Sequence, residues 1–206
     1  MGERLPTDVF TREDRQRYRH KLKRCLWVFE RMLLEGRFET GRKLMGIELE
    51  LNLAGDDQTP VNINEQVLAR IASQDFQTEL GQFNIEVNIA PHKLAGTLFS
   101  ELEEELRTSL NYANRKANEM GAHIVMIGIL PTLMPEHLSA GWMSESTRYQ
   151  ALNDSIFTAR GEDIMIDIAG PERLSLQAAS IAPESACTSM QLHLQVSPED
   201  FAKNWN

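Results

Sequence analysis

Cysteine is scarce in this sequence: the 206 residues include two, Cys25 and Cys187. Cys25 lies in an apolar run with helical spacing and Cys187 stands just before an apolar strand, so we expect both to be buried free thiols. Two distant cysteines exclude a small disulfide-stapled scaffold, and free thiols are typical of the reducing cytoplasm. We therefore expect a cytoplasmic protein without structural disulfides.

Positive charge is also in deficit, with 21 Lys and Arg against 30 Asp and Glu and a formal net charge of −9. Such a chain has no basic surplus for displacing counterions from nucleic acid or for binding an anionic membrane. Residues 1–10 lack the apolar centre of a signal peptide, and no apolar run reaches the length of a membrane span. We expect neither nucleic acid nor membrane as a partner.

Several familiar motifs are missing. The sequence contains no P-loop, no GxGxxG turn, no GxSxG elbow and no paired CxxC motif. These absences exclude the common glycine-rich phosphate cradles and the usual serine-hydrolase and zinc signatures. The recurrent feature is instead an amphipathic strand whose polar side chains all point the same way.

The clearest of these strands is residues 45–53, in which apolar residues alternate with polar ones. Glu48 and Glu50 fall on the polar side, roughly 7 Å apart along the strand. Like charges at this spacing repel unless solvent or a cation screens them. The pattern fits either a solvated sheet face or a divalent-metal site.

Two later strands, 83–89 and 190–196, repeat the pattern. The first presents Glu86 and Asn88 on its polar side, and the second presents Gln191, His193 and Gln195. Glu79 precedes Glu86 by seven residues, so a bend or a short strand would bring it to the rim of the same face.

The remaining segments predict an α+β fold. Helices are expected at 11–35, 62–73, 98–120, 146–160 and 197–206, a buried strand at 122–130, and a hairpin at 164–168 and 174–178. We expect a curved antiparallel or mixed sheet with helices packed on its apolar face. The chain is expected to be a single domain, with a helical lead-in over 1–40 and the catalytic sheet over 41–206.

If the three amphipathic strands share one sheet, their polar faces converge. This gathers Glu48, Glu50, Glu86 and His193, with Glu79 at the rim and the amides Asn52, Asn88, Gln191 and Gln195 around them. Carboxylates with one imidazole suit Mg²⁺ or Mn²⁺, whereas zinc fits poorly because this group of residues contains no cysteine and a single histidine. A carboxylate-held metal would also let this acidic chain bind a phosphate.

The order of these motifs resembles that of the glutamate–cysteine ligases and related carboxylate–amine ligases of the glutamine-synthetase-like superfamily. The likeness rests on Gly46–Glu50, the acidic strand containing Glu86, and Met190–Val196, and it runs from about residue 40 to the end. It implies a glutamine-synthetase-like fold, in which an antiparallel sheet curves into a funnel-shaped active site.

The resemblance implies a ligase that uses ATP as a co-substrate and Mg²⁺ or Mn²⁺ as cofactor. Glutamate would be phosphorylated on its γ-carboxylate, and an amine, cysteine by default, would attack the acyl phosphate. The implied metal ligands are Glu48, Glu50, Glu79, Glu86 and His193. The implied substrate- or nucleotide-binding residues are Asn88, Arg148, Tyr149, Gln191 and Gln195.

Two alternatives stay open: a related phosphoryl-transfer enzyme with another acceptor, and a non-catalytic metal- or nucleotide-binding module on the same fold. The final segment opens as a helix at Ser197-Pro198 and runs for two turns, so we expect the chain to be the N-terminal part of a longer ligase. The family's further phosphate-contacting residues would then lie in the remainder of the parent chain, and the 206 residues alone would be inactive.

Overall fold

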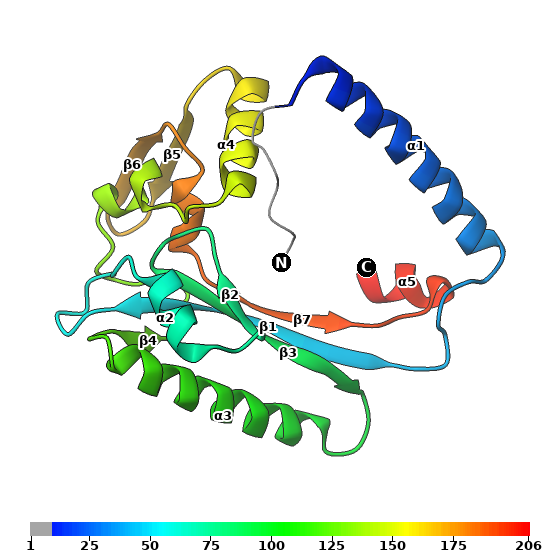
Figure 1. Cartoon of the computed structure of the whole chain (residues 1–206), viewed down its shortest axis with the longest axis horizontal. Helices are drawn as coiled ribbons and strands as arrows, with labels where there is room; N and C mark the ends of the chain where they lie inside the picture. The colour runs from blue at the N-terminus through cyan, green and yellow to red at the C-terminus, as the bar shows by residue number, and fades with distance from the viewer. Residues whose placement is uncertain (1–9) are drawn as a thin grey trace.

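The computed structural model describes residues 10–206, in an α+β arrangement (Figure 1). The first nine residues of the lead-in expected over 1–40 therefore lie outside the described residues. Within them, the helices are α1 (Arg12–Leu34), α2 (Asn64–Ile71), α3 (Leu98–Asn118), α4 (Thr147–Arg160) and α5 (Pro198–Trp205). The strands are β1 (Leu44–Ala54), β2 (Phe76–Thr78), β3 (Asn84–Lys93), β4 (His123–Val125), β5 (Ile164–Ala169), β6 (Arg173–Ala178) and β7 (Met190–Leu194). Three 3₁₀ turns cover Pro135–Leu138, Ala140–Trp142 and Ala182–Ala186.

The main sheet has five strands and is antiparallel throughout, with β1 at its centre. On one side of β1 lie β3 and then β2. On its other side β7 pairs with the first half of β1 and β4 with the second half (Figure 1). The sequence-based prediction of an α+β fold with an antiparallel sheet is thus confirmed.

The core lies on the apolar face of this sheet, where α2 and α3 pack (Figure 1). Alternation along the strands directs one set of side chains to this face. Leu51, Leu53 and Ile85 are fully buried there, and Leu98 and Leu102 of α3 close over them. The helices therefore cover the face that alternation selects, and the polar face is left on the other side.

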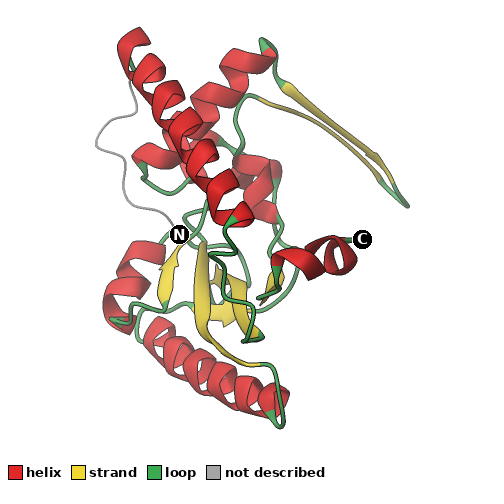
Figure 2. Cartoon of the chain, turned by 90° about the vertical axis from the view of Figure 1, so that its right-hand side faces the viewer, coloured by secondary structure: helices red, strands yellow, loops and turns green. Residues whose placement is uncertain are grey.

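After β3, α3 and β4, the chain crosses to the polar side. Here a smaller cluster forms from Leu80, Met143, Ile181 and Ala182, against which α4 packs Tyr149, Ile156 and Phe157. Beyond α4, β5 and β6 form the predicted hairpin as a separate two-stranded sheet, which extends away from the rest of the molecule (Figure 2).

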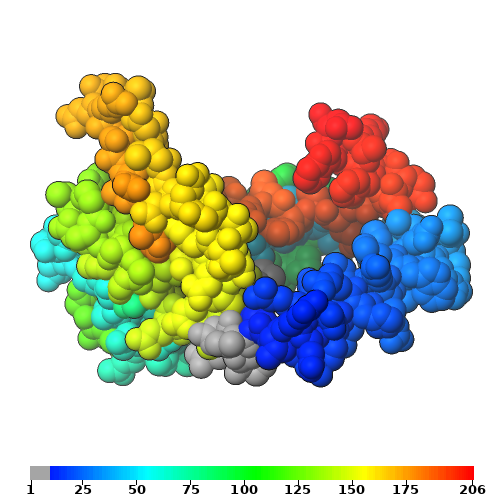
Figure 3. All heavy atoms as spheres, turned by 90° about the horizontal axis from the view of Figure 1, so that it is seen from above, coloured from blue at the N-terminus to red at the C-terminus, as the bar shows by residue number. Residues whose placement is uncertain are grey.

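The helix predicted at 11–35 is α1, and it begins with a capping box in which Thr11 and Asp14 satisfy each other's backbone N–H groups. None of its residues is buried, and Trp27 and Leu26 are more than half exposed. Seen from above, the surface is hollowed between α1, α4 and α5, with β7 along its floor (Figure 3).

Strand β7 corrects one prediction. Its pairing Met45↔Leu194 and Ile47↔Leu192 puts its apolar residues on the expected face of the sheet. They were expected to face the core, yet Leu192 and Leu194 are each 52% exposed, because α2 and α3 pack under β3, β2 and β4 and not under β7. Alternation predicts a face but not what covers it.

The prediction of buried thiols is also wrong, since Cys25 and Cys187 are both exposed. Cys25 lies on the uncovered α1, and Cys187 lies outside the two apolar clusters.

The predicted buried strand at 122–130 is too long. Only His123–Val125 pair with β1, and Met126 and Ile129 beyond them are exposed. The strand ends here because, on this side of β1, residues 45–49 already pair with β7. Among the described helices, none combines the length and apolarity needed to cross a membrane.

Candidate metal centre

The register of the sheet aligns the polar residues in rows. Glu50 pairs with Glu86, which pairs in turn with Gln77 of β2. One row further, Glu48 stands between Asn88 and Gln191. Directly paired residues share a face of an antiparallel sheet, so these side chains lie on the face opposite α2 and α3.

Three carboxylates converge at one point of this face. Glu50, Glu79 and Glu86 each offer an oxygen, and these oxygens lie within 4.8 Å of one another. Glu79 reaches this point because β2, a strand of three residues, ends at Thr78 immediately before it. The expected bend or short strand before Glu86 is therefore present.

The segment that carries Glu79 is held on both sides by hydrogen bonds. The Ser144 backbone N donates to the Leu80 carbonyl at 2.7 Å, and Ser144 Oγ donates to the Glu79 carbonyl. Gly81 is required here, because a Cβ would overlap Asn84 Oδ1 and touch Ser185. The backbone around Glu79 is thus fixed independently of its side chain.

Neighbouring polar groups orient the other two carboxylates. Gln77 Nε2 and Asn88 Nδ2 both donate to Glu86 Oε1, at 2.6 and 2.7 Å. The Ser189 backbone N donates to Glu50 Oε2 at 2.8 Å. Gln77 and Ser189 were not predicted as site residues; Gln77 gave no sequence signal because β2 is too short to show a period, and Ser189 acts through its backbone.

Two of these carboxylates, Glu79 and Glu86, have pKa values shifted in opposite directions. Burial raises the pKa of Glu79 to about 8, with further increases from its hydrogen bond to Glu86 and from the charges of Glu86 and Glu50. Burial also acts to raise the pKa of Glu86, but hydrogen bonds from Glu79, Gln77 and Asn88 hold it below its ordinary value. At neutral pH Glu79 therefore keeps a proton that it shares with Glu86.

Helix α4 brings Tyr149 beside these carboxylates. Burial raises the pKa of its hydroxyl to about 12, and the charge of Glu79 is the next largest cause. Arg148, the other residue of the predicted pair, is exposed and lowers that pKa through its own charge. Tyr149 thus adjoins the centre and also packs in the small apolar cluster with Ile156.

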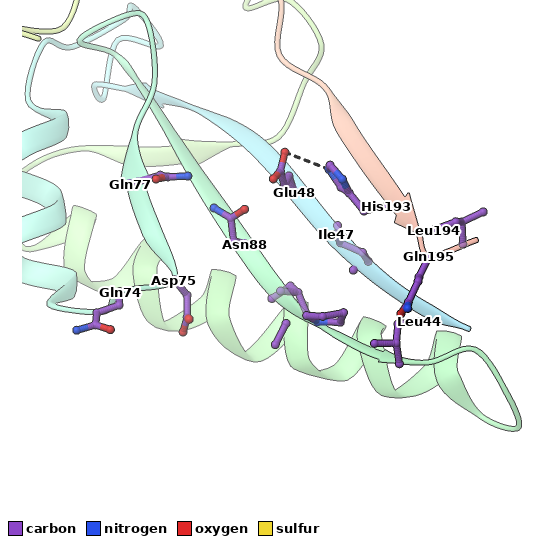
Figure 4. Close-up of a pocket in the computed structure, with 14 residues that line it drawn as sticks. Leu44, Ile47, Glu48, Gln74, Asp75, Gln77, Asn88, His193, Leu194 and Gln195 are labelled. Atoms are coloured by element: carbon purple, nitrogen blue, oxygen red, sulfur yellow. Dashed lines mark ion pairs between the residues drawn. The ribbon is translucent and has the colours of Figure 1, made fainter. Parts of the chain in front are cut away.

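Glu48 and His193 form a separate pair. His193 Nε2 lies 3.2 Å from Glu48 Oε2, and the two side chains meet across β1 and β7 (Figure 4). Among the described residues, the group of carboxylates close enough to share one metal ion comprises Glu50, Glu79 and Glu86 and omits this pair. The structure therefore brings together three of the five predicted metal ligands and places the other two beside them.

A cavity of about 680 Å³ lies next to the centre, over the beginning of β1 and the end of β3 (Figure 4). It shares no residue with the three carboxylates, but Gln77 and Asn88 line it and also hold Glu86. Of the predicted binding residues, Gln195 lines the cavity, and Gln191 lies on β7 opposite Glu48.

The three carboxylates fit a divalent cation. They supply only oxygen, which Mg²⁺ and Mn²⁺ prefer. Burial, together with their mutual repulsion, makes Glu79 keep a proton at neutral pH. A cation that displaced this proton would relieve that repulsion. Compared with models of known protein families and with curated proteins, the chain matches none.

Proposed function

We propose that this chain carries the metal-binding part of an ATP-dependent carboxylate–amine ligase with a glutamine-synthetase-like fold. The observation that carries the proposal is the convergence of Glu50, Glu79 and Glu86 on the polar face of an antiparallel sheet. These are three of the positions at which the motif order of glutamate–cysteine ligases implies metal ligands. The glutamate substrate, ATP and the amine acceptor all follow from that resemblance.

In this proposal the centre binds Mg²⁺ or Mn²⁺ through the three carboxylates. A bound divalent ion supplies positive charge for phosphate oxygens and so compensates the net charge of −9 when ATP binds. Glu79 must first give up the proton that it shares with Glu86.

The surrounding residues act as positioning groups. Gln77 and Asn88 fix the orientation of Glu86, and the Ser189 backbone fixes that of Glu50. Tyr149 is half-buried beside them and limits the access of water from the side of α4. The carboxylates are thus set in place before any ligand arrives, which lowers the cost of binding.

The catalytic role is tested by following ADP release with Mg²⁺, glutamate and a panel of amines. The assay uses the protein as it occurs naturally. We expect ADP release that requires both glutamate and one of the amines, and that is lost in Glu50→Gln.

Metal-dependent ADP release without any requirement for glutamate or amine would contradict the ligase and support a different phosphoryl transfer. Metal binding without any ADP release would support a non-catalytic binding module. Glu104→Gln on α3 is the matched control, because Glu104 is exposed on the helix that covers the opposite face of the sheet.

A further inference from the structure

Asn64, the first residue of α2, is a polar side chain buried on the covered side of the sheet. Helix α2 packs on the apolar face, opposite the three carboxylates (Figure 1), and Asn64 is 3% exposed. A buried amide is costly unless its donors and its acceptor find partners. The partners of Asn64 therefore show which parts of the chain it holds together.

Two of these partners belong to the turn that joins Glu79 to Glu86. The turn is closed by a hydrogen bond from the Asn84 backbone N to the Gly81 carbonyl at 2.9 Å. Asn64 Nδ2 donates to the carbonyl oxygens of Gly81 and Asn84, at 3.2 Å in each case. Gly81 follows Glu79 by two residues, and Asn84 precedes Glu86 by two. Asn64 thus bonds to the backbone close to two of the three predicted metal ligands.

A third hydrogen bond links Asn64 to Glu79 through a serine. Asn64 Nδ2 donates to Ser144 Oγ at 2.9 Å, and Ser144 Oγ donates in turn to the Glu79 carbonyl. Asn64 Oδ1 accepts from the Glu65 backbone N at 2.8 Å, so it is the amide nitrogen that faces the carbonyls. In the part of the chain that the structure describes, Asn64 makes no hydrogen bond to the side chains of the three carboxylates. Any effect it has on the centre must pass through the backbone.

We propose that Asn64 is a positioning residue of the metal centre, which holds the backbone of Glu79 so that its carboxylate meets that of Glu86. The inference rests on the proposed function and adds to its metal centre a residue from the opposite face of the sheet. Residues 79–82 belong to no strand, so their conformation depends on hydrogen bonds from outside the sheet, among them those of Asn64 and Ser144. Loss of a partner that orients a ligand typically lowers metal affinity by about 10–100-fold.

The test compares the Mn²⁺ affinity of Asn64→Ala with that of Asn114→Ala, measured by electron paramagnetic resonance. Asn114 is the matched control because it lies on α3, on the same covered face, and its Oδ1 accepts from the Ile124 backbone N at 2.9 Å. Ile124 belongs to β4, which carries none of the three carboxylates. We expect Asn64→Ala to weaken Mn²⁺ binding by about 10–100-fold and Asn114→Ala to leave it unchanged.

Two further variants separate positioning from a general loss of structure. Ser144→Ala removes the hydroxyl between Asn64 and Glu79, and it should weaken Mn²⁺ binding by about tenfold even where Asn64→Ala does not fold. Both changes should weaken binding by less than about threefold when Glu79 is already replaced in Glu79→Gln, because they act through that residue. Parent-like affinity in Asn64→Ala and Ser144→Ala would overturn the inference, as would an equal loss in Asn114→Ala or an undiminished loss in the Glu79→Gln background.

Hydrogen exchange in the metal-free protein distinguishes failure of this inference from failure of the proposed function. We expect the backbone amides of Gln82 and Asn84 to exchange about tenfold faster in Asn64→Ala, and that of Ile124 to do so in Asn114→Ala instead. If the parent protein binds no Mn²⁺ but these amides respond as expected, the proposed function fails and the role of Asn64 in holding Glu79 stands. If Mn²⁺ binds and neither affinity nor exchange responds to Asn64→Ala, the inference fails and the proposed function stands.

Discussion

Glu79 lies diagonally across the sheet from Glu86, and the two carboxylates meet although Gln77, not Glu79, is the direct partner of Glu86. Residues on a diagonal have Cβ atoms about 7–8 Å apart, within reach of two long side chains. Burial, and then this contact, raise the pKa of Glu79 to about 8, and the same contact helps to hold the pKa of Glu86 below its ordinary value. Glu79 and Glu86 thus share a proton at neutral pH.

The stability of the metal-free protein should fall as the pH rises from about 5 to about 8. The folded protein keeps the Glu79 proton up to a pKa of about 8, whereas the unfolded chain loses it near the ordinary value of 4.5. The folded state then binds more protons in this window, so the free energy of unfolding decreases with pH. The lowered pKa of Glu86 has the opposite effect, but below the ordinary value of 4.5.

Urea denaturation at several pH values measures this effect. Glu79→Gln, which cannot titrate, should show a flatter dependence between pH 5 and 8. Equal slopes for the two proteins would show that Glu79 does not hold the proton.

Gln77 should matter to metal affinity although it is not a ligand. Gln77→Leu removes a donor that orients Glu86 at 2.6 Å, and loss of such a supporting contact typically lowers metal affinity by about 10–100-fold. A Mn²⁺ titration followed by electron paramagnetic resonance measures the affinity. Gln66→Leu on the exposed side of α2 is the control. An unchanged affinity in Gln77→Leu would show that Glu86 does not need this donor.

Gly81→Ala should destabilise the protein and weaken metal binding together. The added Cβ would overlap Asn84 Oδ1, and Asn84 donates to Asn52 Oδ1 at 3.0 Å in the buried interior of the sheet. Relief of that overlap must move either this amide pair or the backbone that carries Glu79. Gly141→Ala, at a glycine whose Cβ would meet open space, should have little effect on either quantity. Normal stability and metal affinity in Gly81→Ala would contradict the tight fit described around Glu79.

Leu51 and Leu192 lie on the same face of the sheet, but their replacement by alanine should change the free energy of unfolding by very different amounts. Leu51→Ala removes a fully buried side chain of the core and should lower the free energy of unfolding by about 2–5 kcal/mol. Leu192→Ala, in a strand whose apolar side is uncovered, should change it by about 0.5 kcal/mol or less in the 206-residue chain. Chemical denaturation of both variants measures the difference. Similar losses in the two would mean that β7 is covered in solution.

The sequence predicts the strands well because alternation is a local property. Residues 45–53 and 83–89 specify their faces by a period of two, and the register confirms that Glu48, Glu50 and Glu86 lie on one face. The burial of β7 could not be predicted in this way, since it depends on how far α3 extends under the sheet. The same holds for residues 126–130, whose apolar composition indicates a buried strand that the pairing of β7 prevents.

The sequence also could not predict which carboxylates of the site lie together. Glu48 and Glu50 look equivalent as an i, i+2 pair, but their neighbours differ. Glu50 stands in the row of Glu86, whereas Glu48 is one row further and within reach of His193. The register between the strands thus places Glu50 in the candidate metal centre and Glu48 beside the cavity.

The most direct test of the account is a Mn²⁺ titration of the protein and of Glu50→Gln, Glu79→Gln and Glu86→Gln, followed by electron paramagnetic resonance of the free ion. We expect one saturable site, Mn²⁺ binding that tightens from pH 6 to 8 as Glu79 loses its proton, and a loss of at least about tenfold in affinity in each variant. Glu104→Gln should bind as the parent protein does. The absence of a saturable site, or equal affinity in all of these variants, would contradict the assignment of a metal centre to this face of the sheet.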